Sequence, residues 1–289
     1  MVILGNGILT AEISETGAQL SRLADKDTEY LWNADPEVWA RHAPILFPFV
    51  ARLPEQQYRY RGKMYGPLKN HGIAPYARFM AESSDSTSCT MLMVVTDEIR
   101  QLYPFDFDFR VRYRLDGHTL HISYLVSNRG EGDMFYAIGS HPGFNVPIAK
   151  NLKFEDYYVE FPEAGNVMQR LFTAERFVSD DDVPYPLEDN RIPLHHDLFD
   201  DDAICMKNTG YTAVIRSEKD RRSITVRYPD TPWCAIWHIP KRDARYVCIE
   251  PWFSLPGKPG INDIEKRDDF QRLHGGESAE YDLSITIGN

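Results

Sequence analysis

The sequence predicts an all-β protein that folds as one large antiparallel β-sandwich. Apolar and polar residues alternate with a period of two over long stretches, whereas helical periodicity is scarce. The 19 prolines and 18 glycines divide the chain into many short elements, as is typical of strands joined by turns. The chain shows no internal repeat, low-complexity linker or break in composition, so we expect residues 1–289 to form a single domain.

Two hairpins are expected in the first half of the chain. The shorter one spans residues 58–65, with Gly62 near its turn. In the longer one, the odd positions of residues 105–115 are apolar or aromatic and the even positions are charged. An Asp-Gly pair then supplies a turn, and residues 120–126 resume the alternation. One face of this hairpin is therefore buried, and its solvated face carries Arg110, Arg112 and Arg114.

The second half of the chain continues the same pattern. Residues 224–228 and 281–287 alternate in the same way and predict two more half-buried strands. One or two helical turns are expected within residues 97–102 and within residues 263–273. A large sandwich of this kind has long loops and a broad concave face, on which side chains from distant parts of the chain can meet.

The chain is acidic, with 43 Asp and Glu residues, 32 Lys and Arg residues and a net charge of -11. This balance argues against general binding to nucleic acid or to an anionic membrane, because both need a basic face. No window approaches the roughly 18 apolar residues of a membrane span, and the first residues lack the features of a secretory leader. Four cysteines without a CxxC pair predict reduced, mostly buried thiols in a cytoplasmic protein.

Residues 140–145 (SHPGFN) and 248–253 (CIEPWF) carry the strongest chemical signal. His141 follows small residues and precedes a proline, and histidine is the side chain whose pKa lies near neutrality. Glu250 ends an apolar run, and glutamate is a natural partner for moving a second proton. Together they predict acid–base chemistry on a small ring-shaped substrate. The structural alternatives are a core or turn histidine, and an ion pair from the glutamate to Arg242 or Arg245.

Three further side chains are candidates for substrate binding. Arg52 interrupts an apolar run, where its planar donors could hold sugar hydroxyls or form an inter-strand ion pair. His71 lies beside aromatic residues in a loop interrupted by Gly and Pro, which also suits a surface or turn histidine. Asp202 ends an acidic run and is the member best placed to point inward, although Asp200 and Asp201 can be aligned with the same role.

Two other clusters are assigned structural roles. Trp233 and Trp237 could stack on sugar rings, but aromatic residues at strand spacing are more often part of a core. The run from His195 through His196 to Asp197 resembles a metal site only superficially, because adjacent strand residues point to opposite faces. We therefore expect no metal.

Five segments resemble the aldose 1-epimerase (galactose mutarotase-like) family, in particular its bacterial LacX-type branch. They are residues 43–52 (APILFPFVAR), 70–72 (NHG), 140–145 (SHPGFN), 199–203 (FDDDA) and 249–252 (IEPW). Their order and spacing cover nearly the whole chain. The resemblance implies a single β-supersandwich that interconverts the α and β anomers of a hexose by opening its ring, without a cofactor or a metal.

The same resemblance implies roles for the candidate residues. His141 is expected to be the general acid that protonates the ring oxygen, and Glu250 the general base that takes the proton of the C1 hydroxyl. Arg52, His71 and Asp202 are expected to bind hydroxyls of the monosaccharide and orient its ring. The expected assembly is a monomer or homodimer, with no nucleic-acid or membrane partner.

Two departures from the family bear on the identity of the sugar. Better-known galactose mutarotases carry a Tyr-like residue where this chain has Gly143, and a glycine where it has Ala51. Two other functions stay open. A non-catalytic sugar-binding or sensor protein would not need a matched acid and base. A hexose-phosphate 1-epimerase would need a basic pocket, for which the unconvincing candidates are Arg59, Arg61, Lys63, Lys69 and Arg78.

Overall fold

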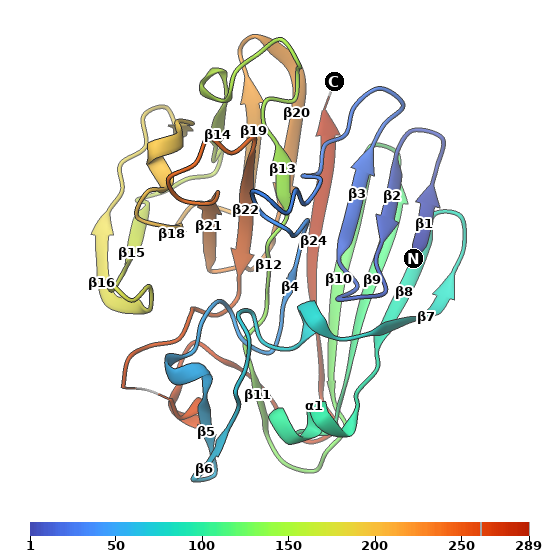
Figure 1. The fold of residues 1–289 in the computed structure, drawn as a ribbon, viewed down its shortest axis with the longest axis vertical. Coiled ribbons are helices and arrows are strands. Elements are labelled where there is room, and N and C mark those ends of the chain that lie inside the picture. Colours follow the sequence, from blue (N-terminus) through green and yellow to red (C-terminus); the bar gives the residue numbers. More distant parts are fainter. Residues whose placement is uncertain (261, 289) are drawn as a thin grey trace.

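Two large antiparallel sheets dominate the structure, a computed structural model that describes residues 1–260 and 262–288 (Figure 1). The strands of the larger sheet run in the order β17 (Arg191–Pro193), β14 (Tyr158–Glu160), β19 (Thr212–Ser217), β20 (Asp220–Arg227), β24 (Ser278–Gly288), β10 (Thr119–Asn128), β9 (Phe107–Asp116), β8 (Ser88–Met93) and β7 (Phe79–Ser84). The ladders between these strands are antiparallel. The predicted all-β, antiparallel class is confirmed.

The second large sheet carries the segments with the strongest chemical signal. Its order is β16 (Val178–Pro184), β15 (Met168–Phe172), β18 (Ile204–Lys207), β21 (Trp233–Trp237), β22 (Tyr246–Trp252), β12 (Gly139–Ser140) and β4 (Ile45–Leu46). A further strand, β13 (Gly143–Asn145), also pairs with β22. Since β22 has neighbours on both edges and every one of its residues is buried, it forms the fixed centre of this sheet.

Smaller elements complete the fold. A three-stranded sheet contains β1 (Val2–Gly5), β2 (Thr10–Ile13) and β3 (Leu20–Ala24), and two-stranded sheets join β5 (Tyr58–Tyr60) to β6 (Lys63–Tyr65) and β11 (Met134–Tyr136) to β23 (Gln271–Leu273). The α-helix α1 spans Asp97–Leu102. Single 3-10 turns occur at Pro54–Gln56, Ala74–Tyr76, Phe154–Asp156, His196–Phe199 and Ile264–Lys266.

The long predicted hairpin is present as β9 and β10. Burial along β9 alternates from Phe107 onward, as expected for a strand with one face in the core. On the other face, Arg112 and Arg114 are exposed, and half-buried Arg110 pairs with Glu82 at 2.8 Å. The shorter hairpin, β5–β6, and the strands β20 and β24 also match their predicted segments.

The two predicted helical segments have different outcomes. Helix α1 occupies residues 97–102, and the hydroxyl of Thr96 caps it by accepting a hydrogen bond from the Ile99 N–H at 3.3 Å. The segment of residues 263–273 contains one helical turn, the lower of the two numbers expected. One 3-10 turn forms at its start, and its end joins a sheet as β23, because Leu273 pairs with Met134 and is buried.

Aromatic side chains join the two large sheets. Phe47, which follows β4, stacks on Phe109 of β9 with ring centroids 4.4 Å apart and planes 19° apart. Both rings are fully buried. Burial on this scale is the main favourable term of folding, so this contact ties the sheet that carries the site to the larger sheet.

Candidate functional site

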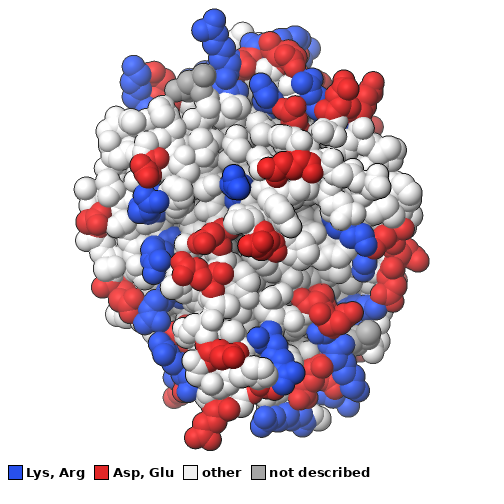
Figure 2. All heavy atoms as spheres, turned by 180° about the vertical axis from the view of Figure 1, so that it is seen from behind, with Lys and Arg blue, Asp and Glu red and all other residues white. Residues whose placement is uncertain are grey.

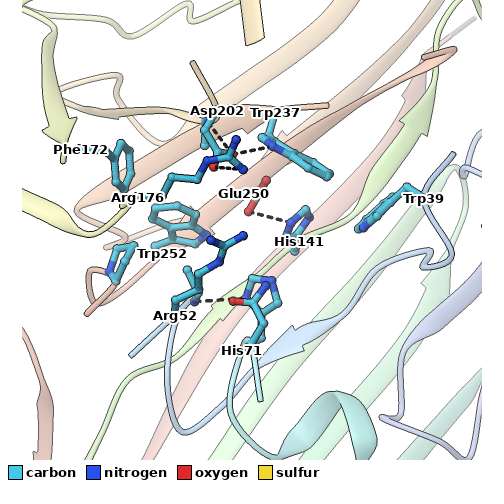
Figure 3. Close-up of a pocket in the computed structure, with 14 residues that line it drawn as sticks. Trp39, Arg52, His71, His141, Phe172, Arg176, Asp202, Trp237, Glu250 and Trp252 are labelled. Carbon is cyan, nitrogen blue, oxygen red and sulfur yellow. Dashed lines mark hydrogen bonds and ion pairs between the residues drawn. The ribbon is translucent and has the colours of Figure 1, made fainter. Parts of the chain in front are cut away.

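The register of β22 brings the two proton-transfer candidates together. Residues 141–142 connect β12 to β13, and both of these strands pair with β22 in a register that places His141 opposite Glu250. The Nε2 atom of His141 lies 3.3 Å from Oε2 of Glu250 (Figure 3). Their side chains are 7% and 2% exposed, so the pair is almost completely withdrawn from water. The alternative ion pair from Glu250 to Arg242 is not formed within the described ranges, because that guanidinium donates to the Glu37 carbonyl at 2.6 Å.

Burial pushes both members of the pair toward their neutral forms. It lowers the pKa of His141 well below the usual 6.5, and the nearby His71 and Arg41 lower this pKa further. It raises the pKa of Glu250 well above the usual 4.5, and the charge of Asp202 raises it further. Because charge is disfavoured on both groups, the resting pair consists of a neutral imidazole and a protonated carboxyl group. It therefore holds one titratable proton over a broad pH range.

His71 is held as a neutral hydrogen-bond donor. The Ala51 N–H donates to Nδ1 of His71 at 3.2 Å, and the His71 N–H donates to the Ala51 carbonyl at 2.9 Å. Burial, together with Arg41 and Arg52, lowers the pKa of His71 to about 3. Since Nδ1 accepts, the ring proton resides on Nε2, where it can be donated to a ligand.

Unusual backbone conformations support this part of the site. Ala51 and His71 have φ angles of 50° and 66°, in the left-handed region. At the next residue, Gly72, a Cβ would lie 2.7 Å from the Phe47 carbonyl oxygen, so only glycine fits. Left-handed residues other than glycine are uncommon and cluster at functional sites, which marks this loop as one under constraint.

Asp202 is the member of the acidic run that enters the pocket. Its Oδ1 atom accepts a hydrogen bond from Nε1 of Trp237 at 2.8 Å, and its Oδ2 atom lies 3.2 Å from Nη1 of Arg176. Its φ angle is 92°, another strained value. Asp200 and Asp201 line only the neighbouring cavity, and Asp200 accepts a hydrogen bond from the Lys241 N–H at 3.1 Å.

A cavity of about 140 Å³ collects all five residues predicted for the site. Trp39, Trp237, Trp252 and Phe172 form its aromatic walls, which suit the C–H faces of a sugar ring (Figure 3). Arg52 forms no ion pair with any residue in the described parts of the chain, so its guanidinium is free for a ligand. The cavity is lined by Trp39, Ala51, Arg52, Asn70, His71, His141, Phe172, Arg176, Asp202, Ala203, Trp237, Glu250, Trp252 and Pro256.

Two interpretations of the sequence need correction. Trp237 lines the pocket rather than the core, whereas Trp233 lies beneath the guanidinium of Arg170 at 4.9 Å. The argument against a metal at residues 195–197 assumed a strand, but a 3-10 turn begins at His196. There, His196 Nδ1 lies 3.2 Å from Nε2 of His238.

The pocket residues that the sequence analysis missed include Trp39, Phe172 and Arg176. Trp39 lies on a loop before β4, Phe172 ends β15, and Arg176 lies in the turn between β15 and β16. Neither a motif nor a periodic pattern distinguishes them, because their role comes from how the loops fold over the sheet. Arg176 lies next to Asp202 only in the folded chain, so the sequence carried no signal for its role.

One group near the pair has the composition of a metal site. His141, Cys248 and Glu250 place their ligand atoms within 4.8 Å of one another. Burial raises the pKa of the Cys248 thiol well above its usual range, and the charge of Glu250 raises it further. Because a metal binds the thiolate rather than the thiol, this environment opposes metal binding. The expectation of a metal-free site stays a prediction.

One face of the molecule mixes acidic and basic side chains. On the face drawn in Figure 2, acidic and basic side chains are interspersed along the edges of the molecule. The mixed charges of this face do not concentrate the positive potential that binding to a polyanion requires. No helix within residues 1–260 and 262–288 has the length and apolar character to cross a bilayer.

The fold agrees with what known proteins show. A sequence model described as aldose 1-epimerase matches residues 1–285, so the chain belongs to the aldose 1-epimerase family. It is therefore an isomerase of the sugar-epimerase type. Within that family, its relatives include the plasmid and chromosomal LacX proteins of Lactococcus lactis subsp. lactis. Each is 32% identical over 261 residues, or 87% of both chains.

Solved structures place the fold in the same group. A galactose mutarotase related enzyme from Lactobacillus acidophilus matches with a TM-score of 0.92 and 33% identity, covering 100% of this chain and 97% of its own. A galactose mutarotase-like protein from Lactobacillus casei matches with a TM-score of 0.92 and 29% identity, covering 99% of each chain. The resemblance to the galactose mutarotase-like family, inferred from five short segments, is confirmed.

Proposed function

We propose that this protein interconverts the α and β anomers of a hexose by acid–base catalysis through the open-chain aldehyde. The observation that carries the proposal is the buried His141–Glu250 pair, 3.3 Å apart at the base of an aromatic-walled pocket. The ring oxygen and the C1 hydroxyl are bonded to the same carbon. An acid and a base that act on these two oxygens must therefore be close neighbours.

The chemistry requires one proton on the pair. In the reactive form, His141 donates this proton to the ring oxygen while Glu250 accepts the proton of the C1 hydroxyl. The C1–ring oxygen bond breaks and the free aldehyde forms. Rotation about C1–C2 presents the other face of the carbonyl, and closure with the roles reversed gives the other anomer. The pair ends with one proton, as it began.

The other predicted residues orient the sugar. We propose that the Nε2–H of His71 and the guanidinium of Arg52 donate to ring hydroxyls, and that Asp202 accepts from one. Trp237 fixes the carboxylate of Asp202 through the 2.8 Å hydrogen bond. Groups held in this way lose little freedom when the ligand binds, which favours a fixed orientation of the ring.

Polarimetry tests the proposal. Freshly dissolved α-glucose or α-galactose should mutarotate faster in the presence of the protein. His141→Asn and Glu250→Gln should each lower the rate by about 10²- to 10⁴-fold, the usual contribution of one acid or base. Asp201→Asn, at the neighbouring cavity, is the matched control. Full activity in either pair variant, with native circular dichroism, would exclude the assigned roles.

A hexose-phosphate 1-epimerase is the second candidate, and the structure changes which basic residues bear on it. The basic residues considered from the sequence are not the relevant ones, since the pocket is lined by Arg52 and Arg176. Asp202 offsets the charge of Arg176, which leaves one uncompensated arginine and favours the neutral sugar. If phosphorylated hexoses alone respond, this second candidate replaces the first. If a sugar binds without any change in rate, the protein is a sugar sensor.

Three further expectations accompany the proposal. We propose that residues 1–289 form one domain, in line with a family match that runs over residues 1–285. A cytoplasmic location is supported by the four buried cysteines, all with free thiols. A monomer or homodimer remains the expected assembly, and sedimentation analysis would distinguish the two.

A further inference from the structure

Trp39 fills a slot that small residues leave open beside the acid–base pair. Gly143 of β13 pairs with Cys248 of β22, which pairs on its other side with Trp237 of β21. Residues paired in this way project to the same face of a sheet. Glycine has no side chain, so the row formed by Gly143, Cys248 and Trp237 leaves a gap above Gly143. A Cβ on Gly143 would lie 2.8 Å from Cζ3 of Trp39 and 3.5 Å from Sγ of Cys248. The indole therefore occupies the volume that a side chain at residue 143 would need.

Three rings and one hydrogen bond fix the indole in this slot. Trp39 stacks on His141 with centroids 5.0 Å apart and planes 25° apart, and on Tyr246 at 5.2 Å and 17°. It meets Trp237 edge-on at 5.4 Å and 72°. Its backbone carbonyl accepts a hydrogen bond from Nε1 of Trp32 at 2.8 Å, which anchors the loop that carries it. Aromatic contacts of this geometry are favourable beyond the area they bury.

The histidine depends on such packing. A functional histidine is usually oriented by a hydrogen bond at its second ring nitrogen. Within residues 1–260 and 262–288, however, no group hydrogen-bonds Nδ1 of His141, although this atom is buried. Instead, Trp39 covers one face of the ring, while Trp237 and His71 meet it edge-on, each with centroids 5.3 Å away.

We propose that Trp39 is a positioning residue for His141, and that residue 143 is glycine because Trp39 needs the space above it. The indole holds the imidazole plane so that Nε2 faces Glu250, and it keeps water away from the ring. This role rests on the proposed function.

The test has one readout that does not depend on activity. In the substrate-free protein, NMR titration follows the imidazole of His141, which faces Glu250 and His71 and also lies close enough to Arg41 to feel its charge. Trp39→Ala opens the ring to water, and Gly143→Ala displaces the indole. Each should move the pKa of His141 up toward 6.5 and lower kcat by about 10- to 100-fold, as expected for a misplaced catalytic group.

Double variants test the coupling between the two positions. Gly143→Ala should add little to Trp39→Ala, because the indole that it displaces is already gone. Gly143→Tyr in the Trp39→Ala background returns a ring to the slot and should recover part of both properties. Trp39→Phe should keep most of them, and Trp233→Phe, whose ring lies outside the pocket, is the matched control.

The possible results are distinguishable. A Trp39→Ala variant with an unchanged titration and kcat within about twofold of the parent overturns the inference, as do fully additive losses in the double variant. If the protein does not accelerate mutarotation but the titration moves as expected, the proposed function fails and the positioning of the ring stands. If Trp39→Ala does not fold, Gly143→Ala and Trp39→Phe decide the question by the same two measurements.

Discussion

At the scale of single residues, the acid–base pair is controlled by charges that surround it. Asp202 lies in the same pocket as Glu250, and its charge is the second cause, after burial, of the raised pKa of that glutamic acid. Asp202, which is paired with Arg176, therefore has an electrostatic effect besides its proposed role in binding hydroxyls. It also sets the pH range over which the pair keeps its single proton.

The first prediction concerns this pH range. If the pair needs one proton, kcat/KM should fall on the acidic side when the pair binds a second proton, well below pH 6.5, and on the alkaline side when it loses its single proton, well above pH 4.5. Asp202→Asn removes a negative charge, which lowers the pKa of Glu250 and moves the alkaline limb to lower pH. Asp201→Asn should leave the limb in place. A limb that moves upward in Asp202→Asn would contradict this account.

A second prediction concerns the strained backbone at Ala51. Its φ of 50° costs an L-residue about 1–2 kcal/mol, while glycine costs about 0.4–1 kcal/mol through the entropy of the unfolded chain. Ala51→Gly should therefore stabilise the protein by up to about 1 kcal/mol in urea unfolding. Ala81→Gly, within strand β7, should instead destabilise it by about 0.5–1 kcal/mol. Equal effects at both positions would show that Ala51 is not strained.

At the scale of elements, the long hairpin carries much of the contact between the sheets. Phe109→Ala removes a ring that packs on Phe47 and should lower the free energy of unfolding by about 3–5 kcal/mol. Arg112→Ala, on the exposed face of the same strand, should change it by less than about 0.5 kcal/mol. Denaturant unfolding measures both. Similar losses in the two variants would mean that stability does not depend on which face of β9 a side chain occupies.

Elements whose faces differ strongly could be predicted from the sequence. The alternation in residues 105–115 and 281–287 marks strands with one wet face, and these are β9 and β24. Residues 271–273 have no such contrast, and β23 forms there because a distant strand, β11, offers a partner. The strand β22 is buried on both faces, so its sequence indicates burial but not its neighbours.

The site could be predicted only in part, because the sequence identifies its residues but not their neighbours in the fold. His141, Glu250, Arg52, His71 and Asp202 belong to segments with recognisable residues, and all five line one pocket. Their contacts depend on the pairing of β12 and β13 with β22, and the sequence carries no record of that register. Trp39 and Arg176 come from loops, whose course over the sheet is decided by tertiary packing.

At the scale of the whole molecule, buried neutral histidines make stability depend on pH. Burial lowers the pKa of His71 to about 3 and that of His238 to about 4, and lowers that of His141 as well. Below pH 6.5 the unfolded chain binds protons that the folded chain does not, so stability falls as the pH falls toward 3. Glu250 has the opposite sign above pH 4.5, because its folded pKa is raised.

Urea unfolding between pH 7 and pH 4 tests this balance. With three histidines acting against one glutamic acid, the free energy of unfolding should decrease toward acid, with net uptake of protons on unfolding. His238→Asn should make the decrease shallower without changing residues of the pocket. The outcome that contradicts the prediction is a protein that is more stable at pH 5 than at pH 7.

The central position of β22 has a consequence for how the enzyme can change. The carboxyl group of Glu250 and the imidazole of His141 are held by paired strands of the sheet, whereas the surrounding pocket walls include loop residues. In the proposed mechanism, the sugar itself then makes the half-turn that exchanges the two sides of the aldehyde, while the pair stays in place. Substitutions in the loop residues that line the pocket can therefore change which sugars fit without altering the acid–base pair.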